Sequence, residues 1–142
     1  MTAPKNPIKR SLVFFLVPDF TMVAFATAVE PLRIANRMLG YDAYKWRLAS
    51  VDGRPVFASN GVECAVNGSL EDERRKLAGP DRPSIVFVCS GINVESYANR
   101  SVFARLREEY NRGVGVGGLC TGAHVLASAG LLSNKRCAIH WE

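Results

Sequence analysis

Short apolar runs alternate along this chain with longer segments of helical periodicity. Residues 11–17 (SLVFFLV) and 84–89 (SIVFVC) are continuous apolar runs, which is typical of strands buried on both faces. Residues 44–51 and the glycine-rich run 114–119 predict two further strands. Strands that alternate with helices form parallel sheets covered on both faces. The pattern therefore predicts one α/β domain with a mostly parallel sheet and right-handed connections.

The segment between the first two strands predicts a helix over residues 22–39. Its first half is almost entirely apolar, so we expect that half to be buried. Asp19 or Thr21 can cap its amino end. Pro31 lies inside the segment, and we expect it to kink the helix or to split it in two, because proline has no N–H to donate to the preceding turn.

Local signals predict the shorter elements. Asn60-Gly61 lies between two β-prone pieces and predicts a hairpin. Ser69 and Asp72 have the spacing of a capping box, which predicts that a short helix begins there. Ser101 is expected to cap the helix that precedes the fourth strand.

The most informative stretch of the chain follows the fourth predicted strand. Gly118, Cys120 and Gly122 form a G-x-C-x-G pattern ahead of a helix rich in Ala and Leu. This is the cysteine form of a nucleophile elbow, in which a strand turns sharply into a helix and holds the nucleophile at the tip. The glycines let strand and helix pass closely, and the helix amino end favours a thiolate. The alternative is that Cys120 is a small buried residue without chemistry.

Three loops are expected to meet at the carboxyl ends of the strands, where α/β sheets bind their ligands. They carry residues 19–21 after the first strand, Ser90 and Gly91 after the third, and Cys120 with Thr121 after the fourth. We expect the backbone N–H groups of Gly91 and Thr121 to form a pair that can hold an oxyanion or a carboxylate.

A nucleophilic cysteine usually needs a base, and the chain has two histidines, His124 and His140. His124 lies one turn into the elbow helix, so its side chain is expected to point away from the thiol. Residues 136–139 predict a last short strand that returns beside the elbow, which favours His140 as the imidazole near Cys120. The alternative is a hydrogen-bonded structural histidine. No acid is an obvious third member of such a triad.

Composition narrows the class of protein. With 142 residues, 48% hydrophobic and 22% charged, the chain is expected to form one soluble globular domain. Its 18 basic residues give a net charge of +5 but are scattered, so no nucleic-acid surface is predicted. Four cysteines without a C-x-x-C motif favour a reducing compartment and predict neither disulfides nor a metal site. Without a secretory signal or a membrane span, we expect a cytoplasmic protein that makes no membrane contact and needs no cofactor.

The block CTGAHVLASAGLLSNKRCAIHWE, residues 120–142, resembles the elbow region of the class I amidotransferase-like superfamily, which contains the PfpI proteases and the isocyanide hydratases. The spacing of Cys120 and His140 is similar to that of the superfamily's catalytic pair. The segment PDFTMVAFATAVEPLRIANR, residues 18–37, looks most like the sensor domains of AraC-type (GlxA-like) transcription regulators. The resemblance implies a flavodoxin-like three-layer α/β sandwich that commonly forms homodimers.

Departures from the enzymes of this superfamily favour a binding role. In those enzymes a carboxylate after the first strand contacts the cysteine, whereas the best-matching positions here are Val23 and Ala24. Thr121 stands where the protease branch has a histidine. The resemblance therefore implies the ligand-sensing and dimerisation domain of an AraC-family regulator. The alternatives are a cysteine-dependent enzyme of the hydratase or protease type and a dimerisation module without a ligand.

The superfamily domain is normally longer than this chain, and the regulators add a helix-turn-helix domain. We therefore expect residues 1–142 to form a C-terminally incomplete sensor domain that contacts DNA only through a domain absent here. We also expect uncovered apolar surface near its carboxyl end, which favours dimerisation.

Two segments suggest the class of effector. Residues 30–36 (EPLRIAN) and 136–142 (RCAIHWE) resemble a subgroup of regulators that respond to arginine or to betaine- and carnitine-like quaternary amines. The carboxylate of such a ligand suits the N–H groups at the elbow. The cation needs an aromatic face or an acid, for which Phe20, Trp141 and Glu142 are the candidates. The expected ligand-binding residues are Asp19, Phe20, Ser90, Gly91, Cys120, Thr121, His140 and Trp141.

Overall fold

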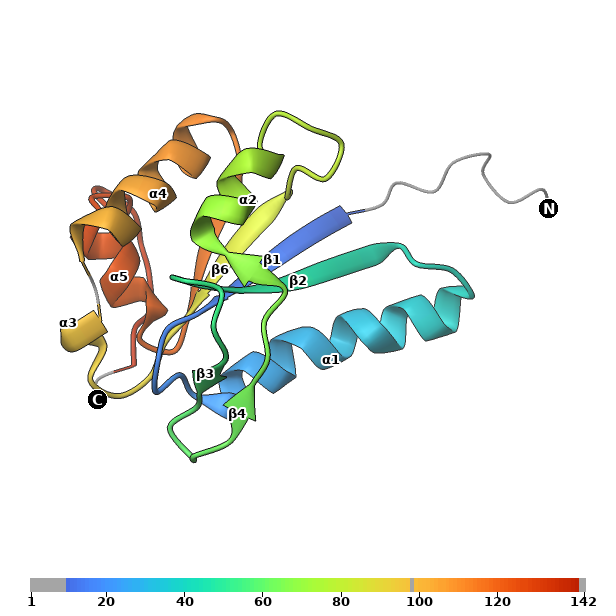
Figure 1. The fold of residues 1–142 in the computed structure, drawn as a ribbon, viewed down its shortest axis with the longest axis horizontal. Coiled ribbons are helices and arrows are strands. Elements are labelled where there is room, and N and C mark those ends of the chain that lie inside the picture. The colour runs from blue at the N-terminus through green and yellow to red at the C-terminus, as the bar shows by residue number, and fades with distance from the viewer. Residues whose placement is uncertain (1–9, 98, 141–142) are drawn as a thin grey trace.

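A computed structural model describes residues 10–97 and 99–140 of the chain (Figure 1). The strands are β1 (Arg10–Leu16), β2 (Tyr44–Ser50), β3 (Val56–Phe57), β4 (Glu63–Cys64), β5 (Gly68–Ser69), β6 (Ile85–Cys89) and β7 (Gly115–Leu119). The helices are α1 (Met22–Leu39), α2 (Leu70–Lys76), α3 (Val94–Tyr97), α4 (Arg100–Asn111) and α5 (Gly122–Ser128).

The described residues contain a five-stranded parallel sheet in the order β5-β2-β1-β6-β7. The predicted parallel sheet is therefore confirmed, and β5 adds a short edge strand to it. β3 and β4 pair antiparallel on either side of Asn60 and Gly61, which confirms the predicted hairpin. Ser69 and Asp72 form the predicted capping box at the start of α2.

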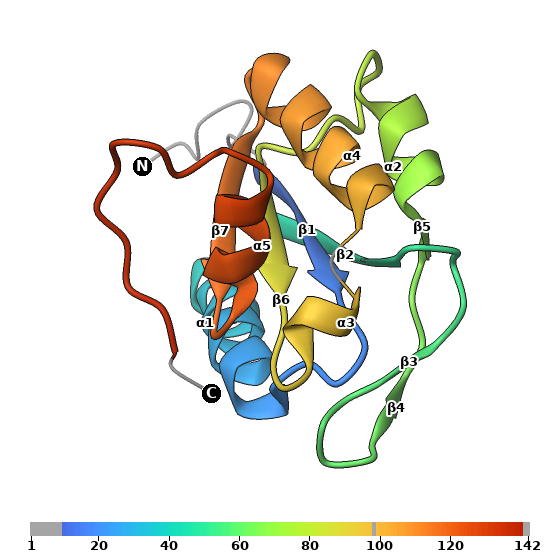
Figure 2. The same cartoon turned by 90° about the vertical axis from the view of Figure 1, so that its left-hand side faces the viewer.

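The central strand β1 is buried on both faces and contributes to two hydrophobic cores. Val13 and Phe15 belong to the core beneath α2, α4 and α5. Leu12, Phe14 and Leu16 belong to the core on the opposite face, where α1 lies. Figures 1 and 2 show α1 alone on one side of the sheet and the other long helices on the other side. The predicted three-layer α/β sandwich is therefore confirmed.

α1 differs from the sequence prediction in two ways. It runs as one 18-residue helix through Pro31, so the expected split is wrong. Pro31 and Thr27, the residue four positions earlier whose carbonyl loses its donor, both lie on the exposed side of the helix, where water can satisfy that carbonyl. No residue of α1 is fully buried either, and Val23 is 67% exposed. The apolar first half contacts the sheet along one face only.

The predicted helix caps also need correction. Thr21 occupies the N-cap position of α1, but its side chain makes no capping hydrogen bond. Asn99, rather than Ser101, caps α4, because its side-chain oxygen accepts from the backbone N–H groups of Ser101 and Val102. Asn and Ser are about equally good caps, so the spacing alone did not separate them.

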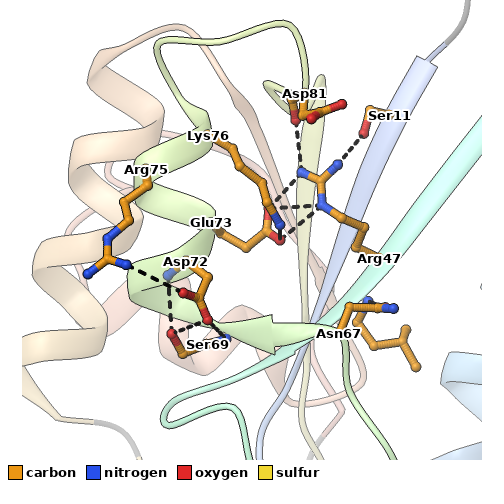
Figure 3. Close-up of polar contacts among 10 residues, drawn as sticks. Ser11, Arg47, Asn67, Ser69, Asp72, Glu73, Arg75, Lys76 and Asp81 are labelled. Atoms are coloured by element: carbon orange, nitrogen blue, oxygen red, sulfur yellow. Dashed lines mark hydrogen bonds and ion pairs between the residues drawn. The ribbon is translucent and has the colours of Figure 1, made fainter.

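A buried ion cluster joins α2 to the sheet (Figure 3). The side chain of Glu73 is fully buried, and its carboxylate accepts hydrogen bonds from Arg47 at 2.6 Å and Lys76 at 2.9 Å. Arg47 also donates to the Ser11 hydroxyl and the Asp81 carbonyl. Burial acts to raise the pKa of Glu73, but the hydrogen bonds and charges of its two partners outweigh burial and hold the pKa below its usual value. The buried charge of Glu73 is therefore compensated by Arg47 and Lys76.

Glu109 on α4 is buried without comparable compensation. Only 3% of the surface of Glu109 is exposed. Its Oε2 has no hydrogen-bond partner within the described part of the chain. Burial, together with the charge of Glu73, raises the pKa of Glu109 to about 7, although Arg105 acts in the opposite direction. The folded protein therefore keeps a proton on this carboxyl at pH values where the unfolded chain has lost it.

Glu109 should make the protein lose stability as the pH rises from about 4.5 to 7, and we expect Glu109→Gln to remove that loss. Below a pH of about 4.5 the carboxyl is protonated in both states, and between about 4.5 and 7 it is ionised only in the unfolded chain. The free energy of unfolding should therefore fall as the pH rises through this window, by roughly 3 kcal/mol at most. The variant should lose this component of the pH dependence, as measured by urea denaturation on both sides of the window. Glu95→Gln, at an exposed position of α3, is the control. Equal pH slopes in all three proteins would contradict the assignment.

Candidate functional site

Cys120 lies at the tip of a tight turn between β7 and α5. Its φ of 55° is in the left-handed region, which residues other than glycine adopt only at an energetic cost. The flanking glycines leave no room for side chains. A Cβ on Gly118 would lie 2.6 Å from the backbone nitrogen of Ala123, and a Cβ on Gly122 would overlap the carbonyl oxygen of Val88. The predicted cysteine elbow is therefore confirmed.

The loops that follow β1, β6 and β7 meet at Gly91. A Cβ on Gly91 would overlap the carbonyl oxygen of Asp19 and lie 2.8 Å from the hydroxyl of Thr21. The buried hydroxyl of Thr121 donates to the carbonyl oxygen of Gly91 at 2.6 Å. Gly91 and Thr121 are therefore in contact, as expected from the parallel sheet, while an anion between their N–H groups stays a prediction.

The sulfur of Cys120 is contacted by Thr21, which the sequence places in the loop expected at this edge of the sheet and offers as a possible cap of α1. The Thr21 hydroxyl donates to the Cys120 Sγ at 3.3 Å. The resemblance places the carboxylate that contacts the cysteine in related enzymes at Val23 or Ala24, two and three positions further along the chain. The available signal was a hydroxyl in the loop directly after the first strand, where the chain crosses the carboxyl edge of the sheet.

His140 lies beside the elbow, but not at the end of a strand. Residues 136–139 form no strand, so that prediction is wrong, and Figure 2 shows the segment after α5 curving out and back towards the carboxyl edge of the sheet. This path brings His140 to the same pocket as Cys120. Trp141 and Glu142 lie outside the described residues. The pocket has a volume of about 310 Å³ and is lined by Gly118, Cys120, Ala138, Ile139 and His140.

Two other expected ligand residues are buried in the protein. Phe20 is fully buried, forms bridges to Ala58 and Gly91, and packs edge-to-face on Phe25 with ring centroids 5.7 Å apart. Its ring presents no open face, which corrects the expectation that it contacts a ligand cation. Ser90 is 1% exposed, and its hydroxyl has no hydrogen-bond partner among the described residues.

Asp19 lines a second and larger cavity, of about 410 Å³, which does not include Cys120. Its φ of 62° is also left-handed. Its carboxylate accepts hydrogen bonds from the Tyr97 hydroxyl at 2.8 Å and the Asn93 amide at 3.5 Å. The hydrogen bond to Asp19, with smaller effects of burial and of the Asp19 charge, raises the pKa of Tyr97, so this hydroxyl stays a donor. Sequence reasoning missed Tyr97, because α3 is a single turn without a motif.

The other side chains of the described residues offer neither a metal site nor a second reactive cysteine at Cys89. In residues 10–97 and 99–140, no three His, Cys, Asp or Glu side chains are grouped so that they could hold a metal ion. Burial raises the pKa of the Cys89 thiol well above its usual range, so this cysteine is an inert core residue. None of the helices in this part of the chain combines the length and apolar character needed to cross a membrane.

An α/β sandwich with a cysteine at a strained strand-to-helix turn defines the class of protein, and the comparison with known families agrees. The model of the DJ-1/PfpI family matches residues 10–142, and the chain belongs to this family. An AraC family transcriptional regulator from Pseudomonas putida has a similar structure, with a TM-score of 0.78 and 26% identity, over 93% of this chain and 67% of that one. A putative transcriptional regulator from Vibrio parahaemolyticus has a TM-score of 0.73 at 18% identity, over 93% of this chain and 67% of that one.

Curated relatives of the chain are named as HTH-type transcriptional regulators. GbdR of Pseudomonas aeruginosa is 37% identical over 98% of this chain and 36% of its own length. CdhR of the same species is 40% identical over 91% of this chain and 36% of its own length. GlxA of Rhizobium meliloti is 38% identical over 91% of this chain and 38% of its own length. The resemblance seen in the sequence is therefore confirmed, and the chain spans little more than a third of the length of these relatives.

We expect Gly91→Ala to destabilise the protein and to disturb the elbow. The added Cβ overlaps the Asp19 carbonyl and crowds Thr21, so the loop after β1 must move, at a cost of about 1–3 kcal/mol. Gly79→Ala is the control, because its nearest contact would be an ordinary 3.8 Å to the Lys76 carbonyl oxygen. Urea denaturation measures both variants. A Gly91→Ala protein as stable as the control variant would contradict this packing.

We expect Thr21→Val to slow the alkylation of Cys120 by iodoacetamide several-fold at neutral pH. The hydroxyl hydrogen bond holds the sulfur in its orientation at the turn, and valine keeps the shape of threonine without the donor. Thr21→Ser should retain most of the rate. Thr27→Val, which removes a hydroxyl bonded only to carbonyls of its own helix, is the control. Mass spectrometry of the Cys120 peptide gives the rate, and an unchanged rate in Thr21→Val would show that the contact does not act on the thiol.

Proposed function

We propose that this chain is the ligand-sensing domain of an AraC-family transcription regulator. The observation that carries the proposal is its similarity to the regulators GbdR, CdhR and GlxA over at least 91% of its residues. In this proposal DNA is bound by a helix-turn-helix domain outside residues 1–142, and the regulator works in the cytoplasm.

The elbow supports sensing in preference to turnover. The hydrogen-bond partner of the Cys120 sulfur is the hydroxyl of Thr21. A hydroxyl can hold a thiol in position, but unlike a carboxylate it does not take up and release a proton near neutral pH. An elbow with this partner keeps a shaped pocket, and the side chain that contacts its sulfur is not a carboxylate.

We further propose that the domain forms a homodimer and responds to a small amino-acid-like or quaternary-amine metabolite. The effector class follows from the resemblance of residues 30–36 and 136–142 to regulators of that kind. Self-association is supported by apolar side chains exposed along α1, where Val23 is 67%, Ile34 49% and Met38 81% exposed.

We expect small amines and amino acids that act as effectors to raise the melting temperature of the purified chain. A ligand that binds only the folded state stabilises it by about 2.7 kcal/mol at a hundred times its Kd, which is several degrees for a domain of this size. Differential scanning fluorimetry with arginine, glycine betaine, carnitine and a wider set of neutral and anionic metabolites is the measurement. The matched Cys120→Ser variant, which keeps the shape of the elbow, tests whether the response needs the thiol.

Turnover would contradict this proposal. If the wild-type chain hydrolysed acyl compounds or hydrated isocyanides, and Cys120→Ser abolished that activity, a cysteine-dependent enzyme would replace the sensor. If no compound of any class changed the melting temperature, a dimerisation module without a ligand would replace it.

A further inference from the structure

We infer that the effector binds in the larger cavity at the carboxyl ends of β1 and β2, and that it is a small zwitterion with an ammonium or quaternary-ammonium group and a carboxylate. The inference rests on the proposed function, since it assigns the place and chemistry of the sensed ligand. The cavity of about 410 Å³ lies within the usual range of small-molecule sites and exceeds the pocket of about 310 Å³ beside Cys120.

The position of the cavity is that of a ligand site in an α/β sheet. It is lined by the end of β1 and the residues after β1 and β2, by β3 and by the end of α3, and Figure 2 shows these segments at the carboxyl edge of the sheet. Apolar walls come from Leu16 and Val56, which are both buried. The charged and aromatic side chains around it are Asp19, Asp52, Arg54, Phe57 and Tyr97.

One part of the cavity suits a cation. Tyr97 and Asn93 both donate to Oδ2 of Asp19, and no hydrogen bond within residues 10–97 and 99–140 ends on Oδ1. These donors hold the carboxylate in place and leave one oxygen for a ligand. Phe57 is 55% exposed and lines the same cavity, so it can offer the aromatic face that the buried Phe20 cannot. A carboxylate beside an aromatic ring is the usual surrounding of a bound ammonium group.

The other part suits a carboxylate. The side chain of Arg54 is 86% exposed, and its contact with Asp52 is long, at 3.8 Å. Such an exposed pair contributes little, so the guanidinium is free to exchange this partner for a ligand carboxylate held by two hydrogen bonds. The backbone beneath it is fixed, because the buried hydroxyl of Ser50 donates to the Arg54 carbonyl at 2.8 Å. With one arginine and two aspartates, the lining favours a zwitterion over a simple anion.

The loop after β1 connects this cavity to the elbow within three residues. Asp19 lines the cavity, Phe20 is fully buried in the core, and Thr21 donates a hydrogen bond to the sulfur of Cys120. A ligand that bonds to Asp19 therefore displaces the same three-residue segment whose Thr21 contacts the thiol of Cys120. The alkylation rate of Cys120 gives a second readout of binding in the cavity.

Calorimetric titration of the 142-residue chain with glycine betaine, carnitine and arginine tests the inference. We expect at least one of these probes to bind, and Asp19→Asn and Phe57→Ala each to weaken it by about tenfold or more. Asparagine accepts the Tyr97 hydrogen bond and tolerates a left-handed φ, so Asp19→Asn should fold. Asp42→Asn, at an exposed position before β2, is the control and should bind like the wild type. The bound probe should also change the alkylation rate of Cys120.

The outcomes separate the inference from the proposed function. If a probe binds the wild type and both cavity variants equally, or if Cys120→Ser loses binding while Asp19→Asn keeps it, the cavity assignment is overturned and the sensor proposal stands. If none of the three zwitterions binds but another metabolite raises the melting temperature, the ligand class is overturned and sensing again stands. If nothing binds at all, both are overturned.

Discussion

The close approach of backbones at Gly91 is the constraint on which the site depends. Three loops from strands far apart in the chain converge there, and each touches this residue or its neighbour. The carbonyl of Asp19 and the hydroxyl of Thr21 lie where a side chain of residue 91 would be, and the Thr121 hydroxyl is bonded to its carbonyl. Any residue larger than glycine would separate the first loop from the elbow, and Cys120 would lose the hydroxyl that contacts its sulfur.

This junction exists because β1 is the centre of the sheet. Its side chains alternate between the two cores, so the strand has no freedom to slide or rotate without moving apolar groups from one core to the other. Parallel pairing with β2 and β6 then brings the ends of all three strands to one edge. The loop after β1 leaves the sheet at that edge, between the larger cavity and the elbow, and its strained Asp19 and hydroxyl-bearing Thr21 face these two features.

The site that results has the geometry of a nucleophile turn, with the Thr21 hydroxyl bonded to its sulfur and His140 in the same pocket. The strained φ of Cys120 and its flanking glycines are those of a nucleophile turn, while its side-chain partner is a threonine. The chain belongs to the DJ-1/PfpI family and is similar over most of its length to part of longer transcription regulators. Two cavities thus lie at one edge of the sheet, and residues 19–21 connect them.

The sequence alone determined the features that depend on local chemistry. Apolar runs placed the strands, Asn60-Gly61 placed the hairpin, and the glycines around Cys120 placed the elbow, because each is set by neighbours in the chain. Tertiary structure decided what local pattern cannot encode. It kept α1 continuous through Pro31, because the lost hydrogen bond falls on the solvent side. It buried Phe20, which the sequence offers as a ligand contact, and it brought Thr21 rather than residues 23 and 24 to the sulfur. It also joined Asp19 to Tyr97, 78 positions away, because only the folded sheet places the two loops at one edge.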